Sequence, residues 1–309
     1  QETIDSLTVV INSLEPDIIG VQEISNTQEF NALINSLPDY SGYYSSTSLR
    51  LGFIYKTSLS LDSISTIYSN NTYNFAGRAP VMINFHFNGQ AFHVINIHLK
   101  CCGDGILDLN DSSDEETRRY NALNMLKNYV DQNLSQSNVL IIGDYNDILI
   151  DNYNNNVFNQ FIGDSINYLF ADFNIATGSP SNWSFPNCPS HLDHILISND
   201  IFDEKVETKI TLDDYHKRDR KGEVNKMLPN NVIAESRIVG LENSNPMPFD
   251  AFSKYYKNPL LRNTRKQLVT IDSSYRSILP NVSVFCPGDN ATNQTPNQKL
   301  ETSTNFTVN

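Results

Sequence analysis

Residues 139–147 read Val-Leu-Ile-Ile-Gly-Asp-Tyr-Asn-Asp, and this stretch decides which fold the chain adopts. Its four leading apolar residues predict a short strand. A helix is predicted just before it, over residues 114–131, because apolar residues recur there at helical spacing and Ser113-Asp114-Glu115-Glu116 has the pattern of a capping box. The chain therefore runs from a helix into a strand that ends in carboxylate and amide side chains.

Helices and strands alternate along the rest of the chain. Helical spacing predicts helices over residues 2–14, 27–36 and 154–162. Apolar and alternating patterns predict strands near residues 17–21, 51–56, 62–68 and 193–198, and a hairpin of residues 80–87 and 91–99 around Asn88-Gly89. This mixed order predicts an α/β or α+β architecture.

Three of the predicted strands end in polar groups that a strand does not need for its own structure. Gln22-Glu23 follows Val21, His98 follows Ile97, and the Asp144-Tyr145-Asn146-Asp147 run follows residue 143. Polar groups at strand ends are expected to converge at one edge of a sheet, where ligands bind in such folds. Oxygen ligands with few thiols favour Mg²⁺ or Ca²⁺ over zinc.

These residues, in this order, resemble the endonuclease/exonuclease/phosphatase superfamily, which includes deoxyribonuclease I, AP endonucleases, neutral sphingomyelinases and inositol polyphosphate phosphatases. The resemblance covers roughly residues 1–198. It rests on four motifs: Glu15-Pro16-Asp17-Ile18-Ile19-Gly20-Val21-Gln22-Glu23, Asn96-Ile97-His98-Leu99-Lys100, Gly143-Asp144-Tyr145-Asn146 and His191-Leu192-Asp193-His194-Ile195. It implies the deoxyribonuclease I fold, a four-layer sandwich of two mixed β-sheets flanked by helices.

The resemblance also implies a metal-dependent phosphoesterase site. Glu23 matches the family's metal-binding glutamate, so Mg²⁺ is the expected cofactor, with Ca²⁺ or Mn²⁺ as alternatives. Asp144 and Asn146 match the pair that orients the attacking water and donates to the phosphoryl oxygen. A simple Asx turn is the competing interpretation of this pair, because Gly-Asp-x-Asn is also turn chemistry.

Further residues are matched by the remaining motifs. His98 matches a histidine beside the scissile phosphate, where an imidazolium can protonate a leaving alkoxide. Asp193 matches the aspartate that orients a second catalytic histidine, and His194 is expected to point to the opposite face of the strand. Arg78 stands where relatives place a phosphate-facing arginine, although a salt bridge would explain it as well.

Two family motifs are missing. The first is an Asn at the end of the family's first strand, which should precede the helix with which this chain begins. The second is a closing Ser-Asp-His; after His194 the remaining histidine is His216, and no Ser-Asp-His surrounds it. The missing strands would be central neighbours, so we expect residues 232–239, 282–285 or 304–308 to cover the gap.

The formal charge of -13 is divided unevenly along the chain. Residues 1–215 carry 9 Lys+Arg and 27 Asp+Glu, which gives -18, whereas residues 216–309 carry 13 and 8, which gives +5. This change predicts a phosphoesterase-like domain over 1–215 and a basic segment over 216–309, with a flexible tail over 287–309. A solvated charge cluster is the alternative. No stretch is long and apolar enough to predict a membrane span.

The leading hypothesis is an exported, Mg²⁺-dependent nuclease that hydrolyses phosphodiester bonds in nucleic acid or a similar substrate. The alternatives are a sphingomyelinase or inositol phosphatase and, from another class, a catalytically impaired domain that serves binding or structure. An extracellular or cell-surface location is expected from the four cysteines, the Asn-X-Ser/Thr sites and the family's exported members. The cysteines are interpreted either as disulfide partners, with Cys101 or Cys102 bridged to Cys188, or as free thiols.

Overall fold

The computed structural model describes residues 2–47, 49–185, 190–203, 205–212, 232–239 and 265–272. Its helices are α1 (Glu2–Leu14), α2 (Thr27–Asn35), α3 (Glu115–Asn133), α4 (Asn159–Ile162) and α5 (Phe173–Ala176), with two 3₁₀ turns at Pro180–Asn182 and Asn199–Ile201. Its strands are β1 (Ile18–Ile24), β2 (Tyr40–Tyr44), β3 (Arg50–Lys56), β4 (Leu61–Thr66), β5 (Val81–Phe87), β6 (Gln90–His98), β7 (Asn138–Asp144), β8 (Tyr168–Phe170), β9 (Asp193–Ser198), β10 (Lys205–Leu212), β11 (Val232–Val239) and β12 (Arg265–Asp272).

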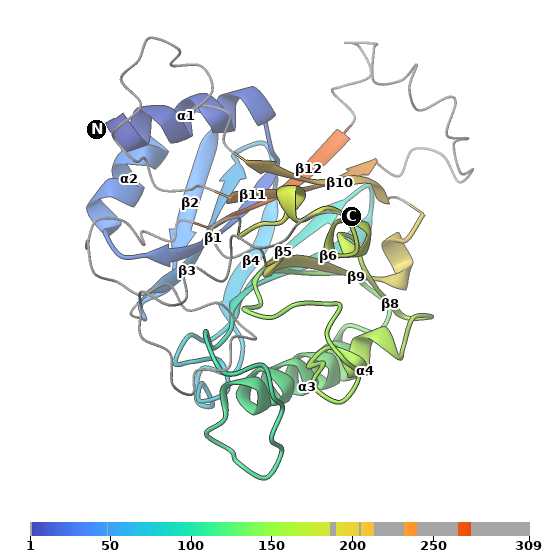
Figure 1. Ribbon diagram of the computed structural model, residues 1–309. Coiled ribbons are helices and arrows are strands. Elements are labelled where there is room, and N and C mark those ends of the chain that lie inside the picture. Colours follow the sequence, from blue (N-terminus) through green and yellow to red (C-terminus); the bar gives the residue numbers. More distant parts are fainter. Residues whose placement is uncertain are drawn as a thin grey trace.

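The strands form two mixed sheets that pack face to face (Figure 1). The first has the order β10-β11-β12-β1-β3-β2 and the second the order β4-β5-β6-β7-β9-β8. Each sheet contains one parallel pair, β1 with β12 and β6 with β7, and its other pairs are antiparallel. The predicted sandwich of two mixed sheets is therefore confirmed.

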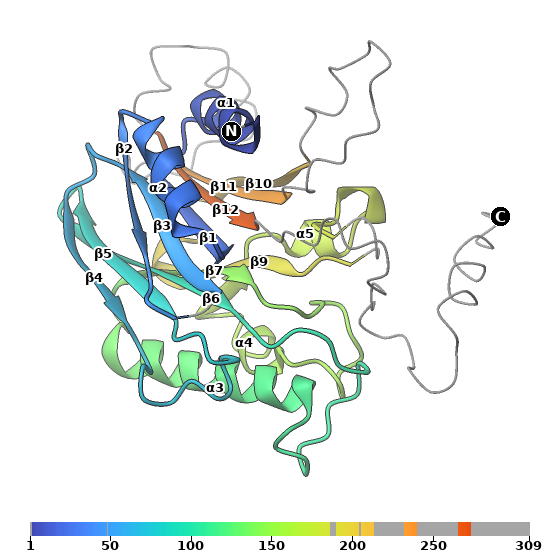
Figure 2. The same ribbon diagram turned by 90° about the vertical axis from the view of Figure 1, so that its left-hand side faces the viewer.

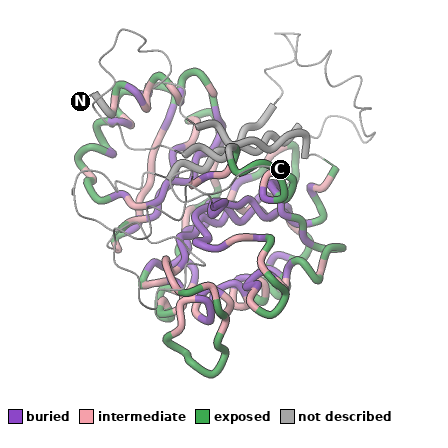
Figure 3. Tube along the Cα trace, in the orientation of Figure 1, coloured by how far each residue is buried: buried purple, intermediate pink, exposed green. Residues whose placement is uncertain are grey.

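Helices cover the outer faces of both sheets, which makes four layers (Figure 2). One apolar cluster, with Ile11, Phe30 and Ile54, joins α1 and α2 to the first sheet. A second cluster lies between the sheets, and a third packs α3 and α4 on the second sheet. Burial is densest along the strands of the second sheet (Figure 3). Three apolar interfaces thus hold the four layers together.

The gap expected from the missing motifs is filled by strands from the basic segment. β11 coincides with the predicted 232–239, and β12, which the sequence pattern did not predict, pairs in parallel with β1. The candidate strands 282–285 and 304–308, and the tail 287–309, lie outside the described residues. The segment 216–309 is therefore more than an appendage to residues 1–215, because two of its stretches belong to the first sheet.

Other predictions need smaller corrections. β2, β8 and β10 were not expected, because their short or charged sequences carry little apolar periodicity. The helix predicted over 154–162 is reduced to α4. The capping box at Ser113 is wrong: Asp114 caps α3 by accepting from the Thr117 amide, and Glu116 turns instead to Arg119 and Gly105. No helix among the described residues is long and apolar enough to cross a membrane.

Candidate active site

Three neighbouring strands bring polar side chains into one row at the edge of the second sheet. In the β6–β7 pairing His98 lies opposite Asp144, and in the β7–β9 pairing Asp144 lies opposite Asp193. All three residues are largely buried. The strand pairing itself therefore places the Asp144 carboxylate between the His98 imidazole and the Asp193 carboxylate.

Glu23 reaches the same row from the first sheet. The Nε2 atom of His98 lies 3.8 Å from Oε1 of Glu23 and 3.5 Å from Oδ2 of Asp144. The sheets can approach here because Gly20 has no side chain: an added Cβ would lie 2.6 Å from Cδ1 of Ile142. Two carboxylates from different sheets thus lie close to one ring nitrogen of His98.

The backbone of Glu23 is strained. The β1–β3 register shifts between Val21 and Ile24, and Glu23 has a φ of 55°, in the left-handed region that non-glycine residues seldom adopt. Bulges of this kind occur next to active sites, where they redirect a side chain. Such a conformation costs about 1–3 kcal/mol and persists at functional sites when the surroundings enforce it.

The loop after β7 carries the second strained residue. Asn146 has a φ of 55°, and its backbone amide donates to Oδ1 of Asp144 at 2.8 Å. The Asn146 side chain donates through Nδ2 to the Leu99 carbonyl at 3.1 Å. The Asx turn considered for this pair is present, and it fixes the side chain of Asp144 beside His98 at the same time.

Two buried amide side chains, Gln22 and Asn96, brace the strands that carry Glu23 and His98, and no role was predicted for them. Gln22 donates to Oδ1 of Asn96 at 2.6 Å, and Asn96 donates to the carbonyls of Val21 and Gly52 at 3.0 and 2.8 Å. These bonds tie β6 of one sheet to β1 and β3 of the other. The sequence contains a sign of this pair, because Gln22 directly precedes Glu23 and Asn96 lies two residues before His98.

His191 and His194 lie away from this row, in a buried cluster with Asp172. His191 Nε2 and His194 Nδ1 lie 2.8 and 2.7 Å from Oδ2 of Asp172, and His194 Nε2 donates to the Asp147 carbonyl at 2.9 Å. The expectation that His194 points to the opposite face from Asp193 is in accord with this placement. Neither histidine supplies a second imidazole beside His98.

The chain matches the family model described as Endonuclease/Exonuclease/phosphatase family over residues 2–222. It belongs to the Endonuclease/Exonuclease/phosphatase family. This membership supports a phosphoesterase function. No curated protein matches the chain.

Solved structures with the same fold are distant in sequence. A zebrafish (D. rerio) TDP2 complexed with a single-strand DNA product superposes with a TM-score of 0.54 at 13% identity, covering 68% of this chain and 83% of that one. The catalytic domain of human Nocturnin with a bound sulfate anion gives 0.50 at 15% identity, covering 67% and 77%. These likenesses support the fold of this Endonuclease/Exonuclease/phosphatase family member.

Arg78 holds the segment that carries His98 in this family member. Its Nε donates to the His98 carbonyl at 3.0 Å, and one terminal nitrogen, Nη2, donates to the Leu99 carbonyl at 2.7 Å. Burial lowers the pKa of Arg78, and the charges of Asp144 and Glu23 act in the opposite direction. The resemblance implied a phosphate-facing arginine, and that role stays a prediction; the observed contacts are those of a residue that positions the His98 segment.

Arg78→Lys is therefore expected to lower kcat for phosphoester hydrolysis between about 10- and 100-fold with little change in KM, because lysine cannot donate to both carbonyls with one planar group. Steady-state kinetics would measure this split. Arg50→Lys is the matched control, since Arg50 makes one longer bond, to the Ile24 carbonyl. A large rise in KM with unchanged kcat would instead favour direct contact with the substrate phosphate.

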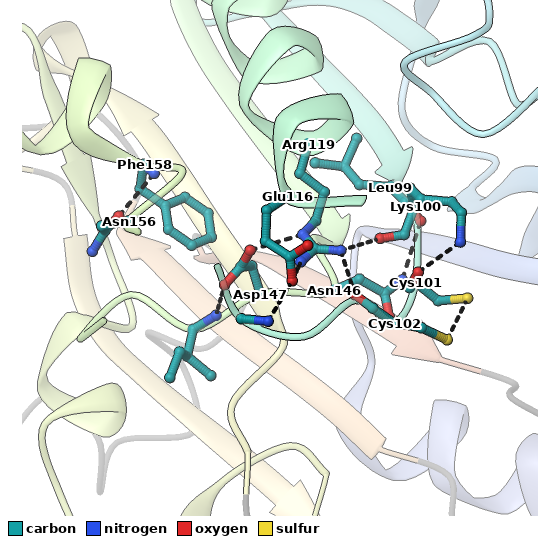
Figure 4. Close-up of polar contacts among 12 residues, drawn as sticks. Leu99, Lys100, Cys101, Cys102, Glu116, Arg119, Asn146, Asp147, Asn156 and Phe158 are labelled. Carbon is teal, nitrogen blue, oxygen red and sulfur yellow. Dashed lines mark hydrogen bonds and ion pairs between the residues drawn. The ribbon is translucent and has the colours of Figure 1, made fainter. Parts of the chain in front are cut away.

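Arg119 joins the loop after β6 to the loop after β7 (Figure 4). It is fully buried in α3 and donates to Oδ2 of Asp147 at 2.7 Å and to the carbonyls of Lys100 and Cys102 at 2.7 and 2.8 Å. The charges of Asp147 and Glu116 raise its pKa although burial alone would lower it. Sequence patterns gave no sign of this contact, because its members are far apart in the chain.

Two of the four cysteines, Cys101 and Cys102, lie among the described residues. The Sγ of Cys102 lies 3.0 Å from that of Cys101. Cys188 and Cys286 lie outside the described residues. The suggested bridge to Cys188 stays a prediction.

A strand, β12, lies beside β1, where a strand that carries one of the missing family motifs was expected. β12 ends at Asp272, which is in register with Gln22, the residue before Glu23. His216, the remaining candidate for a second histidine, lies outside the described residues. Within the described part of the chain His98 is the histidine of this row. The catalytic roles of Glu23, His98, Asp144, Asn146 and Asp193 stay predictions.

Proposed function

We propose that this family member is a Mg²⁺-dependent phosphodiesterase, most specifically an exported nuclease. The observation that carries the proposal is the convergence of Glu23, His98 and Asp144 from three strand ends on one point. Carboxylates around a buried imidazole, next to strained backbone at Glu23 and Asn146, are costly to fold and are typical of a site built for chemistry.

The donor set suits a hard divalent cation. Glu23 offers a partly exposed carboxylate oxygen and Asp144 lies beside it, and oxygen ligands of this kind are those that Mg²⁺ prefers. When bound, such a cation neutralises negative charge that develops on the phosphoryl oxygens.

The chain's own residues have separable tasks. Asp144 accepts a proton from the attacking water and orients it, since its carboxylate is fixed by the Asn146 amide. Asn146 uses one side-chain hydrogen on Leu99 and keeps the other for a phosphoryl oxygen. His98 donates from Nε2 to the leaving oxygen, while Arg78 holds the His98 carbonyl.

A nucleic-acid substrate is supported by the family and by a neighbour of the same fold that holds a single-strand DNA product. A substrate panel tests it: plasmid DNA, RNA, sphingomyelin and inositol phosphates, each incubated with the purified full chain and Mg²⁺. We expect turnover on DNA to exceed that on the lipid and on the inositol phosphates by at least about tenfold, as polyanion-binding contacts would require. Faster release of phosphocholine or phosphate would identify the other substrate classes.

The non-catalytic alternative is favoured by one observation, the single histidine of the row within the described residues. In this alternative the fold is retained for binding after loss of turnover. Hydrolysis of bis-p-nitrophenyl phosphate distinguishes the two functions, because this substrate needs no macromolecular recognition. An absence of Mg²⁺-dependent hydrolysis on every substrate would favour the binding function.

A further inference from the structure

A second cluster of carboxylates lies in the loop between β6 and α3. Asp104, Asp114 and Glu116 each place an oxygen within 4.8 Å of the others. Asp104 is exposed, Asp114 is the N-cap of α3, and Glu116 is buried in its first turn. No histidine or cysteine belongs to this cluster, so its donors are all hard oxygen ligands.

Glu116 gives the cluster a feature that solvated surface acids lack. The residue is 1% exposed, and its Oε1 accepts from the Gly105 amide and from Arg119, both at 2.9 Å. Its Oε2 is buried and has no hydrogen-bond partner among the described residues. An unpartnered buried carboxylate oxygen is costly unless a proton or a cation satisfies it.

The chain folds closely around this carboxylate. Gly103 has a φ of 106°, and a Cβ added there would lie 2.2 and 2.4 Å from the two carboxylate oxygens of Glu116. The Gly103–Asp104–Gly105 segment therefore lies against Glu116 and brings the Asp104 carboxylate beside it. Any residue other than glycine at 103 would close the space that the loop leaves around Glu116.

The charges that face the cluster leave it negative. Arg119 is the cation in contact, but it is shared between Glu116 and Asp147, and Lys100 pairs with Glu115 instead. One guanidinium thus serves two buried carboxylates, while Asp104 and Asp114 add two more negative charges. Burial raises the pKa of Glu116, which is the direction expected when its charge is poorly compensated.

We propose that Asp104, Asp114 and Glu116 form a Ca²⁺ site. The three carboxylates provide oxygen ligands, and the exposed position of Asp104 lets water complete the shell of six to eight oxygens that Ca²⁺ takes. Glu116 is joined through Arg119 to Asp147, which directly follows Asn146 in the loop after β7 (Figure 4). The ion therefore orders both the 103–114 loop and this part of the loop after β7. The inference rests on these side chains and does not depend on the proposed function.

Ion binding, rather than turnover, tests the site. The full chain with Glu23→Gln, which removes a candidate ligand of the other site, is titrated with Tb³⁺ and then Ca²⁺, following tyrosine-sensitised luminescence. Tyr73 is a suitable sensitiser because its hydroxyl donates to the Ser112 carbonyl in this loop, at 3.3 Å. We expect saturable Tb³⁺ luminescence that Ca²⁺ displaces, and a rise in Tm with Ca²⁺.

Variants in the same background locate the ion. Asp104→Asn and Glu116→Gln should each weaken Ca²⁺ binding at least tenfold, whereas Asp111→Asn, an exposed aspartate of the same loop, should change it less than twofold. Asp104 is exposed, so its variant stays informative if Glu116→Gln fails to fold. Ca²⁺ binding that is absent, or unchanged in Asp104→Asn, would overturn the proposal whatever the hydrolytic activity proves to be.

Discussion

Asp144→Asn should lower Mg²⁺-dependent hydrolysis of bis-p-nitrophenyl phosphate by about 10²- to 10⁴-fold, as expected for the loss of a general base. Asparagine keeps the oxygen that accepts from the Asn146 amide, so the turn is preserved. What it removes is the negative charge beside His98. The effect should therefore appear in kcat while the Tm changes little.

The matched control is Asp200→Asn. Asp200 is an exposed aspartate in the turn after β9, and its substitution should leave the rate within twofold of the parent. Initial rates at saturating Mg²⁺ measure both variants. Equal rates for Asp144→Asn and the parent would mean that the row of His98, Asp144 and Asp193 is not the catalytic site.

Asp172→Asn should lower the free energy of unfolding by about 3–5 kcal/mol, because it breaks a fully buried ion pair. Oδ2 of the buried Asp172 carboxylate lies 2.7 Å from Nδ1 of His194 and 2.8 Å from Nε2 of His191. A neutral asparagine would remove the negative charge that both buried histidines contact. Urea denaturation followed by tyrosine fluorescence measures the loss.

The chain offers a matched surface pair for comparison. Asp62 contacts Nδ1 of His86 at 2.6 Å, and both side chains are at least half exposed. Asp62→Asn should cost less than about 1 kcal/mol, because exposed ion pairs contribute little. A loss of similar size in both variants would show that burial does not govern the Asp172 cluster.

The same cluster predicts the pH dependence of stability. Burial alone would raise the pKa of Asp172, but the charge of His194 and the hydrogen bonds from both histidines outweigh it and lower the pKa well below its usual range. A carboxyl group whose pKa is lowered in the folded state stabilises the fold at pH values above its pKa in the unfolded chain, about 3.9. That stabilisation is lost as the pH falls from there toward the folded value. In Asp172→Asn the free energy of unfolding should therefore fall less steeply than in the parent as the pH is lowered through the acid range.

Local sequence patterns predicted the parts of the fold that depend on local contacts. The apolar run of β7 and the periodicity of α3 depend on neighbours within a few residues, and both elements form where expected. The ends of β6 and β7 could be anticipated to lie together because neighbouring parallel strands of one sheet end at the same edge, whereas Glu23 of β1 reaches them from the other sheet. The quoted motifs therefore contained most of the row at the sheet edge.

Long-range pairing accounts for what the sequence did not reveal. β12 has few apolar residues, and it is a strand because it pairs with β1, about 250 residues earlier in the chain. The Arg119–Asp147 pair and the Asp172–His194 pair likewise join segments that are adjacent only after folding. The left-handed conformations of Glu23 and Asn146 are also visible only in the structure.

We propose that the convergent Glu23, His98 and Asp144 form a metal-dependent phosphoesterase site although the Ser-Asp-His motif is missing. The most direct measurement is the rate of bis-p-nitrophenyl phosphate hydrolysis by the purified full chain after EDTA treatment, before and after Mg²⁺ is restored, with Glu23→Gln in parallel. We predict that Mg²⁺ restores hydrolysis in the parent and that Glu23→Gln needs a much higher Mg²⁺ concentration. Hydrolysis that persists in EDTA, or none in the parent at any Mg²⁺ concentration, would contradict the claim.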